Sequence, residues 1–197
     1  MSPPRLVLAS ASPRRHDLLA SLGLAFSVRP VALDEIPLDG EPPAAYVERL
    51  AAAKARAQGA PGELVLAADT VVALAGELLG KPAGPDEARA MLARLAGRRH
   101  EVFTGVALYD SAGERLERAV ERSSVEIAPL TEDRIAWYVA TGEPLDKAGA
   151  YAIQGFGALF VTRIEGNYTN VVGLPLPTVH GLFARLGYDL RDFSFRL

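Results

Sequence analysis

The chain of 197 residues contains no cysteine, which excludes disulfide bonds, thiolate metal sites and a cysteine nucleophile. A chain without disulfides suits a reducing compartment, and we expect it to be cytoplasmic. It also lacks any run of about 18 apolar residues, so no membrane-spanning helix and no membrane partner are expected. Residues 1–5 carry none of the apolar character of a signal peptide.

The sequence also lacks an excess of positive charge, a cluster of histidines and the common nucleotide motifs. The net charge of −3 argues against a broad nucleic-acid surface. His16, His100 and His180 are scattered without metal-ligand spacing, and no GxGxxG motif occurs. Residues 76–82 are one residue short of a P-loop, and Pro82 replaces its Ser/Thr. What remains is oxygen chemistry: carboxylates, a hard cation such as Mg²⁺ or Mn²⁺, and local positive side chains for phosphate.

The hydrophobic share of 49% predicts an ordinary folded core, and its periodicity predicts strands that alternate with helices. The expected strands cover 5–10, 24–31, 64–74, 100–109, 115–127 and 157–166, and the expected helices cover 13–22, 44–58, 85–95, 131–142 and 176–186. The order lacks a strict βαβ rhythm and includes one long hairpin. We therefore predict an α/β fold with a mixed sheet, flanking helices and two lobes around a cleft.

The turn from the first strand to the first helix is a candidate phosphate site. The N-terminus of a helix attracts anions, and Ser10 and Ser12 add hydroxyl groups there. Arg14 and Arg15 add two guanidinium groups, whose paired N–H donors suit phosphate oxygens. Two cations at a helix N-terminus oppose its dipole and call for a compensating anion. The alternative is a capped surface helix with two solvated arginines.

Two charged residues stand where apolar ones are expected. Lys54 continues the helical stripe of Val47, Leu50 and Ala51, so it is either a second phosphate contact or a lysine that extends to solvent at the edge of the core. Asp69 lies inside an apolar strand, where a carboxylate needs a partner. We interpret it as a general base that activates water or as a ligand of a divalent ion. The alternative is an aspartate that caps a turn at the end of the strand.

Three further features have two readings each. Glu35 lies in an acidic loop and is either a metal or water partner or a solvated acid. Lys81 lies in a tight turn and is either a point charge for a phosphate tail or a plain turn lysine. The glycines at 149, 155 and 157 indicate close backbone approach, to a ligand or to another strand.

Six motifs occur in the order found in one known family: SASPRR (10–15), AAKARA (52–57), AADTVV (67–72), LGKP (79–82), DKAGAYAIQG (146–155) and VVGLPL (171–176). Together they span nearly the whole chain, which resembles the Maf family of nucleoside triphosphate pyrophosphatases. The resemblance implies one domain over 1–197, with an elongated mixed sheet similar to that of inosine triphosphate pyrophosphatases. It also implies a nucleotide substrate, a divalent metal, nucleoside monophosphate and pyrophosphate as products, and a homodimer.

The resemblance also assigns site residues position by position. Asp69 matches the family's proton acceptor. Arg14, Thr70 and Gln154 match its specificity positions. The positions that match residues lining its active site are Ser10, Arg15, Glu35, Lys54 and Lys81.

Within the family, the segment AYAIQG is similar to that of the dTTP/UTP branch, whereas the branch for 7-methyl-GTP has an acidic residue in place of Gln154. An amide can donate to a carbonyl of uracil or thymine and accept from N3–H, whereas a glutamate would repel the carbonyl. The expected activity is therefore hydrolysis of dTTP and UTP, or of modified pyrimidine nucleotides. Two alternatives are a 7-methyl-GTP pyrophosphatase and a nucleotide-binding regulator of septum formation that does not hydrolyse its ligand.

Overall fold

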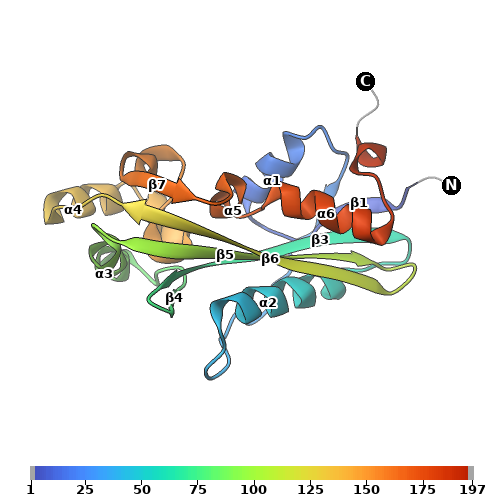
Figure 1. The fold of residues 1–197 in the computed structure, drawn as a ribbon, viewed down its shortest axis with the longest axis horizontal. Coiled ribbons are helices and arrows are strands. Elements are labelled where there is room, and N and C mark those ends of the chain that lie inside the picture. Colours follow the sequence, from blue (N-terminus) through green and yellow to red (C-terminus); the bar gives the residue numbers. More distant parts are fainter. Residues whose placement is uncertain (1–2, 195–197) are drawn as a thin grey trace. The chain divides into compact units, whose positions relative to one another are not determined.

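The structure is a computed structural model that describes residues 3–194 (Figure 1). Its strands are β1 (Arg5–Leu8), β2 (Ser27–Val28), β3 (Glu63–Leu74), β4 (Glu77–Leu79), β5 (Arg99–Asp110), β6 (Arg115–Ile127) and β7 (Val161–Glu165). Its α-helices are α1 (Pro13–Ala20), α2 (Pro43–Ala57), α3 (Pro85–Leu95), α4 (Glu132–Ala140), α5 (Tyr168–Val172) and α6 (Leu176–Leu186). Within the described residues there are also four 3-10 helices: η1 (Glu143–Asp146), η2 (Ala148–Ala150), η3 (Gly155–Leu159) and η4 (Leu190–Phe193).

The strands form one mixed sheet in the order β2-β1-β3-β5-β6-β7, with β4 paired to β3. β1 runs parallel to β2 and β3, whereas the pairs β3–β4 and β6–β7 are antiparallel. The predicted α/β class with a mixed sheet and flanking helices is confirmed. The chain divides into two compact units, Met1–Asp69 with Thr104–Glu121 and Gly173–Leu197, and Thr70–Phe103 with Arg122–Val172.

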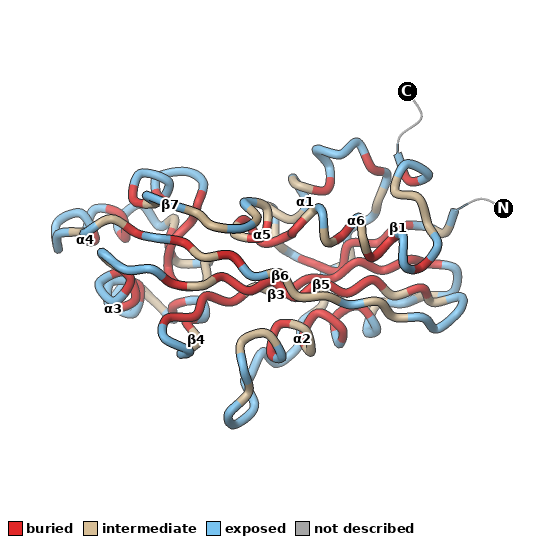
Figure 2. The backbone as a smooth tube through the Cα atoms, in the orientation of Figure 1, coloured by how far each residue is buried: buried red, intermediate tan, exposed pale blue. Residues whose placement is uncertain are grey.

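In the first unit, alternate side chains of β1 and β3 pack against helices on opposite faces of the strands (Figure 1). One face packs against α1 and α6 through Leu6, Leu8, Leu64, Leu66 and Ala68. The other packs against α2 through Val7, Ala9, Val65 and Ala67. All residues of β3 except Thr70 are buried (Figure 2), which explains the near-continuous apolar run in its sequence.

Glycine at position 105 allows α2 to approach β5 closely. A Cβ at Gly105 would stand 2.2 Å from the carbonyl oxygen of Val47 and 2.7 Å from the nitrogen of Glu48. Both atoms belong to the backbone of α2, so a side chain at this position would displace the helix. The close approach brings the stripe of α2 that carries Lys54 down onto the strands.

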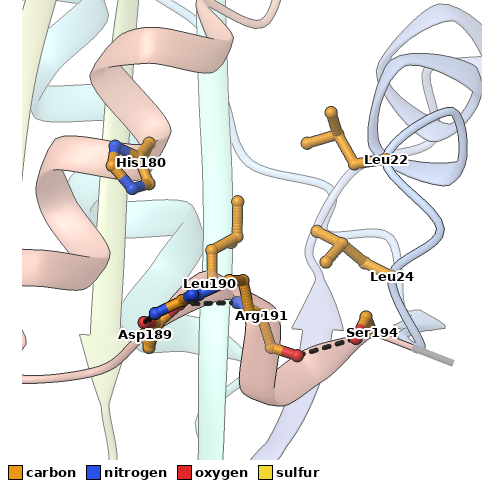
Figure 3. Close-up of a pocket in the computed structure, with 7 residues that line it drawn as sticks. All are labelled: Leu22, Leu24, His180, Asp189, Leu190, Arg191 and Ser194. Atoms are coloured by element: carbon orange, nitrogen blue, oxygen red, sulfur yellow. Dashed lines mark hydrogen bonds and ion pairs between the residues drawn. The ribbon is translucent and has the colours of Figure 1, made fainter. Parts of the chain in front are cut away.

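A pocket of about 360 Å³ also lies in the first unit (Figure 3). Its lining comes from the segment after α1, from α6 and from the segment around η4: Leu22, Leu24, His180, Asp189, Leu190, Arg191 and Ser194. Arg191 forms an ion pair with Asp189 at 2.6 Å. None of the residues expected at the active site lines this pocket.

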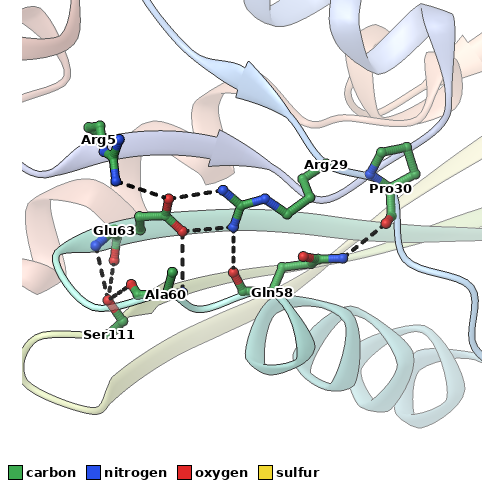
Figure 4. A network of polar contacts seen from close by, with 7 residues as sticks. All are labelled: Arg5, Arg29, Pro30, Gln58, Ala60, Glu63 and Ser111. Atoms are coloured by element: carbon green, nitrogen blue, oxygen red, sulfur yellow. Dashed lines mark hydrogen bonds and ion pairs between the residues drawn. The ribbon is translucent and has the colours of Figure 1, made fainter.

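Glu63, the first residue of β3, has a buried carboxylate that contacts two arginines (Figure 4). Glu63 is 3% exposed and accepts two hydrogen bonds from the Arg29 guanidinium, at 2.8 and 3.0 Å. Arg5 lies 3.6 Å from the same carboxylate, and the hydroxyl of Ser111 accepts from the Glu63 backbone N–H at 3.0 Å. Hydrogen bonds from Arg29 hold the pKa of Glu63 below its usual value, although burial opposes them.

The second unit has its own apolar core, formed by the end of β3 with β4, α3, α4 and the segments that follow α4. Its largest fully buried side chain is Tyr138 of α4. The backbone N–H of Gly149 donates to the carbonyl of Gly80 at 3.0 Å. This bond brings the motifs LGKP and DKAGAYAIQG together.

Most predicted elements are confirmed, and two predicted strands differ. The strand expected at 24–31 is reduced to Ser27–Val28. Its start is bonded elsewhere, since Leu24 pairs with Ser194 and the Ala25 N–H donates to the carbonyl of Phe193. Beyond its end, Pro30 has no N–H to donate. The strand expected from 157 begins at Val161, and residues 155–159 form a 3-10 helix instead. The short helix α5 was not predicted. Among the described residues, no helix is both long and apolar enough to cross a bilayer.

Candidate active site

The turn between β1 and α1 is built as a helix N-terminus with positive side chains. α1 begins at Pro13, its N-cap residue is Ser12, and its first turn contains no acid. The hydroxyl oxygen of Ser10, a residue only 7% exposed, accepts a hydrogen bond from the Ser12 backbone N–H at 3.2 Å. Arg14 and Arg15 lie in the first turn of the helix, and both are partly buried. The helix dipole and the two arginines together favour an anion here.

Arg15 connects separate segments of the chain through three hydrogen bonds. Its Nη1 donates to the carbonyl of Ala68 at 2.7 Å and to the Ser10 hydroxyl at 3.2 Å. Its Nε donates to the carbonyl of Gly173 at 2.8 Å. Burial lowers the pKa of Arg15, and the negative charge of Asp69 opposes that shift. Arg15 therefore holds the turn beside the residue that precedes Asp69.

Asp69 and Lys54 form a buried ion pair. Asp69 follows Val65 and Ala67 in the strand alternation, so its side chain lies on the face covered by α2. Lys54 is on the buried stripe of α2, and its Nζ donates to Asp69 Oδ1 at 2.6 Å. Both residues are 6% exposed. Of the two readings of Lys54, the structure therefore excludes a lysine that extends to solvent.

Glu35 is the second partner of the same lysine. Lys54 Nζ donates to Glu35 Oε1 at 2.6 Å, so the ammonium group lies between two carboxylates. The Glu35 side chain is 45% exposed, whereas that of Asp69 is 8% exposed. Glu35 is thus an exposed loop acid that also forms an ion pair with Lys54, and its role as a metal or water partner stays a prediction. The three side chains form one charged cluster, with Asp69 on its inner side.

Burial controls the proton affinity of Asp69. Burial raises its pKa above the ordinary aspartate value, the charges of Lys54 and Arg15 lower it, and the charge of Glu35 raises it. A carboxylate in this position is a stronger base than a surface aspartate, while the lysine stabilises its ionised form. Such a group can accept a proton from a bound water.

The loop that carries Glu35 is anchored to α2 by residues that the sequence did not single out. The Tyr46 hydroxyl donates to the carbonyl of Glu35 at 3.1 Å. Arg49 donates to the carbonyl of Ile36 at 3.2 Å and to both carboxylate oxygens of Glu41, at 2.7 and 2.6 Å. These hydrogen bonds lower the pKa of Glu41 to about 2. The available signal was the spacing of Tyr46 and Arg49 on one face of α2.

The structure thus brings together Ser10 with Arg15, and Glu35 with Lys54 and Asp69. The close approach at Gly105 was also missed, although an isolated glycine within a strand indicates such an approach. The other expected residues, Thr70, Lys81 and Gln154, belong to the second unit. Thr70 is partly buried, and Lys81 and Gln154 are exposed. Their place in the site stays a prediction.

The sequence matches one protein family and several known proteins. The model of a family described as Maf-like protein matches residues 5–186. The chain is 56% identical to a protein of Anaeromyxobacter dehalogenans strain 2CP-1 over 190 residues, which cover 95% of this chain and 96% of the relative. It is 54% identical to a protein of Myxococcus xanthus, with 94% of each chain covered, and 55% identical to one of Moorella thermoacetica, with 94% and 97% covered. All three relatives are named dTTP/UTP pyrophosphatase.

Proposed function

Because the chain belongs to the Maf family, we propose that it hydrolyses dTTP and UTP to the nucleoside monophosphate and pyrophosphate. The names of the three relatives support this reaction, which would make the protein a hydrolase of phosphoric anhydrides. One observation carries the proposal. The carboxylate of Asp69 is buried at 2.6 Å from the Lys54 ammonium, and Arg15 holds the carbonyl of the preceding residue.

In this proposal Asp69 is the general base. Its Oδ1 is engaged by Lys54, so we assign the proton of the attacking water to Oδ2. The water oxygen bonds to the α-phosphorus, and the bond from the α-phosphorus to the oxygen that bridges to the β-phosphorus breaks. The electron pair of that bond leaves with pyrophosphate, whose growing negative charge needs nearby positive groups.

Four positive side chains are assigned to the phosphates. Arg14 and Arg15 at the N-terminus of α1, with the Ser10 hydroxyl, would contact phosphate oxygens. Lys54 would contact the phosphate beside the attacking water, and Lys81 would contact the departing pyrophosphate. These contacts would hold the chain of phosphates in line with the water.

A divalent cation, Mg²⁺ or Mn²⁺, is part of the proposal because the substrate is a triphosphate. Glu35 and Asp69 fit such an ion, since both offer oxygen ligands and both already converge on a positive charge at 2.6 Å. No group of three or more His, Asp or Glu side chains that could hold a metal occurs within residues 3–194. Phosphate oxygens would therefore complete the set of ligands. When bound, the ion would neutralise negative charge on the triphosphate.

The base would be selected by Gln154, with Thr70 and Arg14 at the other two specificity positions. The Gln154 amide can donate to a pyrimidine carbonyl and accept from N3–H, which matches uracil and thymine. We also propose that the protein is a cytoplasmic homodimer that needs neither nucleic acid nor membrane. Sedimentation velocity of the purified protein tests its oligomeric state.

A substrate panel with Asp69→Asn tests the proposal. With Mg²⁺ or Mn²⁺, we expect the wild-type protein to release pyrophosphate from UTP and dTTP much faster than from 7-methyl-GTP. Asp69→Asn keeps the shape of the side chain but removes the base, so turnover should fall by about 10²–10⁴-fold while UTP still binds. Full turnover by this variant would refute the base. Nucleotide binding without pyrophosphate release by the wild type would favour a regulator, and preferred release from 7-methyl-GTP would favour the other branch.

A further inference from the structure

The carboxylate of Glu143 binds the backbone of the turn that follows Gln154. Its Oε2 accepts from the Phe156 N–H at 2.9 Å, and its Oε1 accepts from the Gly157 N–H at 2.9 Å. Oε1 also accepts from the hydroxyl of Tyr138 at 2.7 Å. Glu143 is the first residue of η1 and lies more than ten residues away in sequence from both amides. These contacts join η1, α4 and the start of η3 in one network.

Tyr138 extends the same network to the other side of Gln154. Its hydroxyl accepts from the backbone N–H of Ala152 at 3.0 Å while it donates to Glu143. The Tyr138 side chain is fully buried in the core of the second unit. The backbone is therefore held two residues before Gln154 and again two and three residues after it.

The turn between these anchors contains a glycine with a positive φ. Gly155 has a φ of +67°, and a Cβ there would lie 2.3 Å from Oε2 of Glu143. The carboxylate thus occupies the space beside the residue that follows Gln154. Burial by itself would raise the pKa of Glu143, but the bonds from Gly157, Tyr138 and Phe156 outweigh it and lower the pKa. Glu143 therefore keeps its charge, and its accepting oxygens, at neutral pH.

The side chain of Gln154 is exposed, so its direction depends on this backbone. Resting on the proposed function, we propose that Glu143, through Tyr138 and the 152–157 backbone, is a positioning residue that determines base selectivity. An amide reads uracil only when its donor faces the carbonyl and its acceptor faces N3–H. Shifted or reversed, the same amide matches the edge of cytosine. A looser turn would therefore weaken discrimination between UTP and CTP more than it would weaken hydrolysis itself.

Glu143→Gln tests this role because it keeps the side chain's size but replaces one accepting oxygen with a donor. The new amide group would face a backbone N–H or the tyrosine hydroxyl. We expect the ratio of kcat/KM for UTP to that for CTP to fall by about tenfold. KM for UTP should rise while kcat changes little, and hydrogen exchange at the Phe156 and Gly157 amides should become faster. Tyr138→Phe should change the ratio in the same direction, because it removes the acceptor for Ala152.

Glu132→Gln is the matched control, since Glu132 is an exposed acid at the first position of α4. It should leave the ratio and the exchange rates unchanged. If Glu143→Gln keeps the wild-type ratio of kcat/KM for UTP to that for CTP, even while it slows the hydrolysis of both, the positioning role is wrong while the proposed function stands. If the wild-type protein releases no pyrophosphate from UTP, the proposed function fails, and the selectivity role of Glu143 fails with it.

Discussion

Replacing Gly105 by alanine tests how closely α2 must approach the sheet for the charged cluster to form. The added Cβ would stand 2.2 Å from the carbonyl oxygen of Val47 and 2.7 Å from the nitrogen of Glu48. Both contacts are with the backbone, so no side-chain rotation relieves them. To restore ordinary contact, α2 would have to move away from β5 by about 1 Å.

The displacement should affect both stability and catalysis. Overpacking of this kind costs about 1–3 kcal/mol, and for a chain of this size each kcal/mol lowers the melting temperature by about 2–4 °C. Lys54 lies on the same helix, two turns beyond Val47, and contacts Asp69 at 2.6 Å. A shift of about 1 Å in a group that holds the base can reduce the rate by as much as roughly 10²-fold.

The assay combines thermal unfolding with kcat/KM for UTP, and Gly181→Ala serves as its control. Gly181 lies in α6, and a Cβ there meets no atom within 4 Å. Alanine in a helix interior is more favourable than glycine by about 0.5–1 kcal/mol, so the control should unfold at a slightly higher temperature with unchanged activity. A Gly105→Ala protein with wild-type stability and activity would refute the argument that this approach positions Lys54.

Three further predictions concern single charged or amide groups. Lys54→Met removes a charge that lowers the pKa of Asp69, so that pKa should rise and the acid limb of the profile of kcat/KM against pH should move to higher pH. Activity at pH 7 should fall by about 10²-fold. An acid limb at the wild-type pH would show that Lys54 does not control the pKa of Asp69. Glu63→Gln should cost about 2 kcal/mol in urea unfolding at pH 7, because Arg29 loses its ionic partner. The Glu63 pKa is lowered in the folded state, so its contribution is present above the usual value of 4.5 and is lost as the pH falls below it; an equal difference between the two proteins at pH 3 would contradict this. Gln154→Glu should slow hydrolysis of dTTP and UTP relative to other nucleotides, and unchanged relative rates would refute the selectivity argument.

Much of the fold could be predicted because its signals are local. Helix and strand periodicity, with proline at helix starts, placed β3, α3, β6 and α6 within a residue or two of their observed bounds. The failures occur where tertiary contacts override local preference. Residues 157–159 were predicted to begin a strand, but they belong to the 3-10 helix Gly155–Leu159, whose first turn is bonded to Glu143.

The candidate site could be predicted in part, because a charge in an apolar element is visible in the sequence alone. Asp69 within a buried strand and Lys54 on a buried stripe were identified by that conflict, and the family motifs added Thr70 and Gln154. Residue types and spacing were therefore enough to select the candidate side chains of the site. Their partners were not determined, because local patterns do not specify distances between distant segments.

Only the tertiary structure decided how those charges are satisfied. The structure places the Lys54 ammonium between Asp69 and Glu35, and it binds Arg15 to the carbonyl of Gly173, 158 residues away in sequence. Strand register and the close approach of α2 at Gly105 set these contacts. Both arise from the packing of segments that are far apart in the chain. The sequence by itself therefore determined most of the elements and the charged groups of the candidate site, while packing decided the geometry in which those groups meet.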